Sequence, residues 1–131
     1  MNIPHRKTRF WLSCLLGVVL LMVIFIIARD SKATWFFATV GKIPYFDKVG
    51  HFFIMGLISL CAVAGLAHRL PFPPWRSSFI VMGCVFLLSS IDELSQAFIP
   101  SRTFSFADLT ASILGIIFLG LIGHRISRQK D

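Results

Sequence analysis

Four long apolar stretches alternate with short polar segments along the chain, at about residues 10–28, 47–67, 78–99 and 105–123. Each is close to the roughly 20 residues that an α-helix needs to cross a bilayer core about 30 Å thick. The third stretch is purely apolar only over 79–91, so a crossing helix must continue through Asp92 and Glu93 to about Ile99, before Pro100 ends it. The pattern predicts an all-α integral membrane bundle of four transmembrane helices.

Composition supports a membrane protein and argues against a nucleic-acid-binding one. Of the 131 residues, 56% are hydrophobic, whereas soluble domains have roughly 45–50%. The formal net charge is +7, but most lysines and arginines flank the apolar stretches, where they set membrane topology. The short length and the lack of an internal repeat predict a single transmembrane domain over residues 1–131.

The first apolar stretch resembles the start of a signal peptide, because the basic residues Arg6, Lys7 and Arg9 precede it. Its span over 10–28 is longer than the roughly 7–15 residues of a signal-peptide core, so we interpret it as an uncleaved helix. If the N-terminus is cytoplasmic, eight lysines and arginines lie on that side and five on the other. This asymmetry predicts a multi-pass protein of the inner (cytoplasmic) membrane with both termini in the cytoplasm.

Polar side chains interrupt the apolar stretches near one set of ends, which this topology places together on the outer side. A charge at the centre of a membrane helix costs roughly 2.5–3.5 kcal/mol on insertion scales, so such groups pair, face a cavity or have a function. We therefore expect an outward-facing polar pocket whose candidate binding residues are Asp47, Lys48, His51, Asp92, Glu93, Gln96, Arg102 and Asp108.

Three of these residues are also candidates for catalysis, although no catalytic assignment follows from them. Asp92 and Glu93 lie roughly 10–12 Å before the predicted end of their helix, at 1.5 Å per residue. His51 follows Asp47 by four residues, so their side chains share a helix face. Either acid could be a general base or a metal ligand with His51 assisting. A helix-dipole contact for Asp47 and a snorkelling histidine are the structural alternative.

Structural roles explain several neighbouring residues. Arg102 could fold back toward Glu93 or face an anionic headgroup, because its planar guanidinium suits carboxylate and phosphate alike. Ser105 and Asp108 have the spacing of a capping box at the start of the fourth helix. The small residues that follow recur every four positions and predict close packing by another helix, at Ala107, Ala111 and Gly115.

The polar residues carry an excess of negative charge. Four carboxylates, Asp47, Asp92, Glu93 and Asp108, face two fixed cations, for a formal sum of −2 with His51 neutral. A carboxyl group is then protonated, His51 is charged, or a cation enters. A proton-sharing network is the first alternative. The second is Mg²⁺, Mn²⁺ or Zn²⁺ held by His51 and carboxylates of the third helix. Neither identifies a cofactor.

These motifs resemble, in this order and spacing, the VanZ-like family of small bacterial membrane proteins. The resemblance covers about residues 42–123 and rests on Asp47-Lys48-Val49-Gly50-His51, Glu93-Leu94-Ser95-Gln96, Arg102, Ser105-Phe106-Ala107-Asp108 and Gly115. It implies a helical membrane protein, and the founding member is linked to low-level teicoplanin resistance. The family pattern has asparagine four residues after the aspartate of the fourth helix, where this chain has Ser112.

The first reading of function is an envelope protein whose outer pocket binds a lipid headgroup or a cell-wall precursor. The resemblance then implies a contribution to glycopeptide or envelope-stress resistance. The alternative is an intramembrane hydrolase or transferase acting on a lipid-linked substrate, although the chain has no HExxH motif or serine–histidine signature. A third reading is a purely structural polar network. The expected partner is a membrane lipid or lipid-linked precursor, and no nucleic acid.

Overall fold

The computed structural model describes residues 12–20, 22–23, 45–98 and 104–128, and within these ranges the chain is mostly helical, with no strand. Three long helices are present, α3 (Phe46–Leu66), α4 (Pro74–Gln96) and α5 (Phe106–Arg128), and the short 3-10 helix η1 (Ala67–Arg69) follows α3. Residues 12–20 and 22–23 are also helical. The all-helical prediction is confirmed.

Three helices in the described part of the chain are long and apolar enough to cross a membrane. They correspond to the predicted spans at about 47–67, 78–99 and 105–123. Only residues 12–20 and 22–23 of the predicted first span, 10–28, are described, and this portion is too short to count as a crossing helix. The structure therefore confirms three of the four predicted spans.

Local chemistry explains where the helices differ from the predicted bounds. α4 begins four residues earlier than predicted, with Pro74 in its first turn, because a proline there has the helical φ angle and lacks only an unneeded N–H. α5 continues past residue 123 to Arg128, since Arg125 and Arg128 favour the negative end of the helix dipole.

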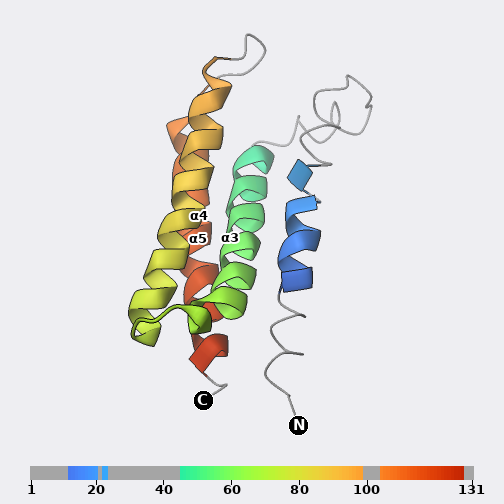
Figure 1. The fold of residues 1–131 in the computed structure, drawn as a ribbon. Helices are drawn as coiled ribbons and strands as arrows, with labels where there is room; N and C mark the ends of the chain where they lie inside the picture. Colours follow the sequence, from blue (N-terminus) through green and yellow to red (C-terminus); the bar gives the residue numbers. More distant parts are fainter. Residues whose placement is uncertain (1–11, 21, 24–44, 99–103, 129–131) are drawn as a thin grey trace.

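The three helices run in alternating directions, so the starts of α3 and α5 and the end of α4 lie together, at the top of Figure 1. α5 packs more extensively against α3 than against α4. Large apolar side chains such as Leu87, Leu88 and Phe118 point outward and are more than half exposed. An outer surface of this kind fits lipid tails better than water.

Small residues allow the close packing of α3 against α5. A side chain at Gly115 would collide with the carbonyl of Phe52, and one at Gly123 would approach the carbonyl oxygen of Leu60 to 2.7 Å. The predicted small-residue stripe is correct at Gly115 and wrong at Ala107, which is exposed. A strict four-residue repeat drifts by roughly 40° per step around a 3.6-residue helix. The buried face of α5 therefore comprises Asp108, Ser112, Gly115, Ile116, Gly120, Gly123 and Ser127.

Candidate functional site

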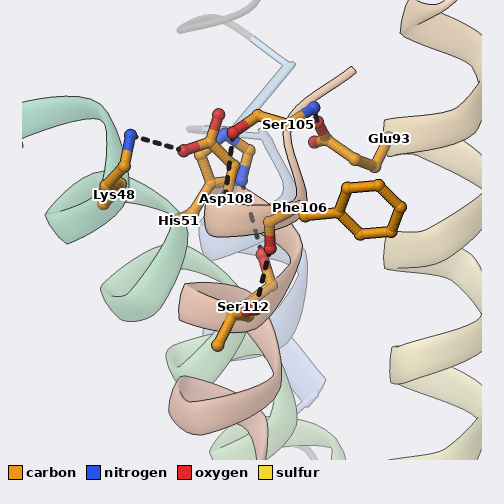
Figure 2. Close-up of polar contacts among 8 residues, drawn as sticks. Lys48, His51, Glu93, Ser105, Phe106, Asp108 and Ser112 are labelled. Carbon is orange, nitrogen blue, oxygen red and sulfur yellow. Dashed lines mark hydrogen bonds and ion pairs between the residues drawn. The ribbon is translucent and has the colours of Figure 1, made fainter.

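An ion pair joins the first turns of α3 and α5. The Nζ atom of Lys48 lies 3.3 Å from Oδ1 of Asp108. Asp108 is buried, whereas the side chain of Lys48 is 37% exposed. Figure 2 shows the two side chains pointing toward each other between the helices. The Lys48 side chain is therefore partly accessible from outside the bundle, while the carboxylate is held within it.

His51 lies one turn further along α3 and contacts α5 through Ser112. Its Nδ1 atom is 3.4 Å from the hydroxyl oxygen of Ser112, which is almost fully buried. The contact is at the long end of the hydrogen-bond range. The serine that replaces the asparagine of the family pattern therefore still offers a polar partner to α3. Nδ1 is the ring nitrogen of His51 that faces α5 in this contact.

The start of α5 is capped by Ser105, which directly precedes the helix, and by Glu93 on α4. Ser105 accepts a hydrogen bond from the backbone N–H of Asp108 through its hydroxyl oxygen at 3.3 Å, as the capping box predicts. The return bond differs, because the N–H of Ser105 donates to Oε1 of Glu93 on α4 at 2.9 Å. In a closed capping box that donor would bind the carboxylate of Asp108. Glu93 takes this role, and Asp108 turns to Lys48 instead (Figure 2).

Two carboxylates and one imidazole come together at this end of the bundle. One ligand atom each of Asp47, His51 and Asp108 lies within 4.8 Å of the others, the first two residues being half-buried and Asp108 buried. We name this set, with Lys48, the helix-end cluster. Its formal charge is −1 with His51 neutral. Carboxylate and imidazole groups can bind a cation, and Lys48 can bind an anion.

The structure brings together part of the predicted set of polar residues. Of the eight predicted residues, four form the helix-end cluster, and Glu93 joins them through Ser105. Asp92 lies half-buried on α4 outside the three-residue group. Arg102 and the side chain of Gln96 lie outside the described residues. The carboxylates that accompany His51 come from its own helix and α5, not from the third predicted helix as we expected.

Sequence reasoning did not identify two polar contacts. Nothing in the sequence indicated that Ser112 contacts His51, apart from its difference from the family pattern. At the opposite end of the bundle, the hydroxyl oxygen of Ser78 lies 2.8 Å from Nδ1 of His124 and donates to the carbonyl of Pro74. A lone serine and a lone histidine 46 positions apart predict no such pair. Both contacts depend on how the helices pack, which a single sequence does not specify.

Comparison with known proteins agrees with these motifs. The VanZ/LLP1 family model matches residues 10–126, which adds the first apolar stretch to the region covered by the motif resemblance. The chain is 31% identical to "Uncharacterized protein C11E3.10" of Schizosaccharomyces pombe over 114 residues. This alignment covers 83% of this chain and 67% of the yeast protein. No solved structure matches the chain significantly. The family match, together with the apolar helices, shows that this chain is a membrane protein that belongs to the VanZ/LLP1 family.

Proposed function

We propose that the helix-end cluster binds the anionic headgroup of a membrane lipid. The observation that carries this proposal is the place of the Lys48–Asp108 pair and His51. These groups lie where three helices long enough to cross the membrane begin or end. The ends of such helices lie near the headgroup layer of a bilayer. A lipid phosphate therefore reaches this depth without leaving the membrane.

The surface beside the cluster suits a lipid better than a water-soluble ligand. Phe46, Val49 and Phe53 on the first two turns of α3 are exposed, and so is Phe106 in the first turn of α5. Acyl chains can pack against these side chains while the headgroup contacts the polar residues. A soluble anion would gain the polar contacts alone.

Lys48 is the group that selects a negative charge. The ammonium group of this partly exposed side chain can exchange Asp108 for a phosphate oxygen or bridge the two. The N-cap residue of α3, Tyr45, makes no side-chain cap, and the dipole of the first turn, which also holds Asp47, favours negative charge at this helix end. Lys48 and the helix start act on the same ligand, because Lys48 lies in that first turn.

The orientation follows from the distribution of basic residues, and the ligand class from a relative of the chain. We propose four membrane spans with both termini in the cytoplasm and the cluster on the outer side, since eight basic residues lie on one side and five on the other. A yeast relative favours a ligand that bacterial and fungal membranes share, such as a phospholipid, over a bacterial cell-wall precursor. A contribution to glycopeptide or envelope-stress resistance would then act through the lipid headgroups of the outer leaflet.

Lipid retention by variants at Lys48 tests the proposal. The protein and its Lys48→Met variant are purified in maltoside detergent, and bound phosphatidylglycerol is titrated by native mass spectrometry. A charge-assisted hydrogen bond contributes about 1.5–3 kcal/mol, so Lys48→Met should weaken binding about tenfold or more. Lys48→Arg should keep most of the affinity. Arg69→Met, in η1 just beyond the other end of α3, is the matched control and should bind like the native protein. Equal affinity in Lys48→Met and Arg69→Met would refute headgroup binding at the cluster.

An intramembrane hydrolase or transferase is the second candidate. The specific observation in its favour is the convergence of Asp47, His51 and Asp108. Glu93, which we considered as a general base, accepts the backbone N–H of Ser105 and so has a structural role. Incubation with phospholipid labelled in its headgroup distinguishes the candidates. Release of label that is lost in His51→Ala supports the enzyme, and intact lipid that stays bound supports headgroup binding.

A further inference from the structure

We propose that Asp47, His51 and Asp108 bind a divalent transition-metal ion of the Mn²⁺–Zn²⁺ class between the starts of α3 and α5. The proposal adds a metal to the site. It deepens the headgroup proposal, because the metal supplies a coordination position for a lipid phosphate. The binding of that phosphate rests on the proposed function, whereas the metal site itself does not.

The three side chains already have nearly the spacing of metal ligands. Their ligand atoms lie within 4.8 Å of one another. Ligands of tetrahedral zinc, each about 2.0–2.2 Å from the ion, are roughly 3.3–3.6 Å apart. The ligand atoms therefore need to approach one another by at most about 1.5 Å to bind one ion. Because Asp47 and Asp108 come from different helices, the ion would also join the two.

Contacts outside the three residues hold two of them in place for a ligand role. Ser112 lies against Nδ1 of His51, which leaves Nε2 as the coordinating nitrogen. Metal-binding histidines usually have such a partner on the other ring nitrogen. Glu93 caps the N–H of Ser105, so Asp108 is not required for the capping box. Lys48 contacts Oδ1 of Asp108, and the second carboxylate oxygen can coordinate.

Charge and donor type select the kind of ion. The helix-end cluster has a formal charge of −1, so a divalent ion changes it to +1, and a phosphodiester then brings the sum to zero. One imidazole with two carboxylates suits Mn²⁺ or Zn²⁺ better than Ca²⁺ or Mg²⁺, which prefer oxygen ligands alone. Three protein ligands leave a coordination position open. A phosphate oxygen beside Lys48 would occupy it.

Metal binding is measured directly on the full-length protein. The chain is purified without a polyhistidine tag in a phosphate-free maltoside buffer. Metal is removed with EDTA, and the protein is then dialysed against ZnCl₂. Elemental analysis measures the bound zinc per chain. We expect about one Zn²⁺ per chain, displaceable by Mn²⁺. Asp47→Asn and His51→Ala should each weaken zinc binding by about tenfold or more, since each removes a ligand. Zinc should raise the melting temperature of the native protein and not of these variants.

Matched controls separate ligand loss from a general loss of charge or fold. Asp92→Asn removes an acid at the same end of the bundle, and His68→Ala removes a histidine at the other end, so both should bind zinc within about twofold of the native protein. If Asp47→Asn or His51→Ala does not fold, Ser112→Ala tests the site through the orientation of His51, and should weaken binding about tenfold. No zinc on the native protein, or equal zinc in all variants, would overturn the metal site.

The same samples distinguish this proposal from headgroup binding. Phosphatidylglycerol retention is measured with and without EDTA. Retention that falls with EDTA supports the metal as the holder of the phosphate. Retention without any bound zinc overturns the metal and keeps the headgroup proposal. One zinc per chain with no retained lipid supports the metal site and refutes the headgroup proposal.

Discussion

Replacing Gly115 by alanine should push α3 and α5 apart directly below the helix-end cluster. A Cβ atom at this position would lie 2.8 Å from the carbonyl carbon of Phe52 and 3.0 Å from its Cα, with the carbonyl oxygen nearer still. The atoms in the way belong to the backbone of α3, so no side-chain rotation relieves the contact. Phe52 follows His51 in the chain, and Gly115 comes three residues after Ser112, so the strain reaches the His51–Ser112 contact.

The size of the effect follows from this geometry. Carbon atoms pack favourably at about 3.5–4.0 Å, so the helices must separate by about 1 Å. Overpacking of this kind costs about 1–3 kcal/mol, and a backbone contact belongs at the upper end. Removing a helical glycine returns roughly 0.5–1 kcal/mol. We therefore expect Gly115→Ala to lower the free energy of unfolding by about 2 kcal/mol, a factor of about 30 in the folding equilibrium.

Unfolding in mixed maltoside and dodecyl sulfate micelles, followed by circular dichroism, measures this loss. Gly83→Ala is the matched control, because it makes the same change on the exposed face of α4, where a Cβ meets nothing within 4 Å. That variant should be as stable as the native protein or slightly more stable. If Gly115→Ala and Gly83→Ala unfold together, the close approach of α3 and α5 is not present in the membrane protein, and the argument from packing fails.

Two further predictions concern the end of α4 and the orientation of the bundle. Glu93→Ala leaves the N–H of Ser105 without its acceptor and should cost about 1–3 kcal/mol, whereas Glu93→Gln keeps an oxygen there and should cost less; equal losses in unfolding assays would contradict the capping role. In a cysteine-free background, Ser101→Cys should react with a membrane-impermeant maleimide from outside intact cells, and Pro71→Cys only after lysis. The reverse pattern would invert the proposed topology.

The hydrophobic pattern predicted the three long helices well, because the length of each helix follows mainly from the length of its apolar run. The expected span at about 47–67 is helix α3 at Phe46–Leu66, since an apolar run of this length favours one continuous helix. The ends were less predictable where polar residues extend a helix. α5 runs on to Arg128 because basic residues suit its last turn, which an apolar pattern does not reveal.

The sequence predicted which candidate residues lie at the same end of the bundle better than it predicted the contacts between them. Topology alone placed Lys48, His51 and Asp108 at the same end, and the structure brings them together. The capping role of Glu93 was not predictable, because its depth in an apolar helix suggests a functional acid, whereas its carboxylate accepts a hydrogen bond from the backbone of Ser105. Which acid completes a cap depends on how α4 packs beside α5.

Glu93 and Asp108 have different partners, and this difference affects how binding data for Glu93 variants are interpreted. Ser105 has one backbone N–H, and either acid could accept it. Because Glu93 does, the carboxylate of Asp108 contacts Lys48 and lies within reach of His51. Without Glu93, the closed capping box becomes the favourable alternative for Asp108, which would withdraw it from the cluster. A loss of lipid or metal binding in Glu93→Ala would therefore not identify Glu93 as a ligand or a catalyst. Retained binding in Glu93→Gln, with loss in Glu93→Ala, would show that this acid acts by positioning Asp108.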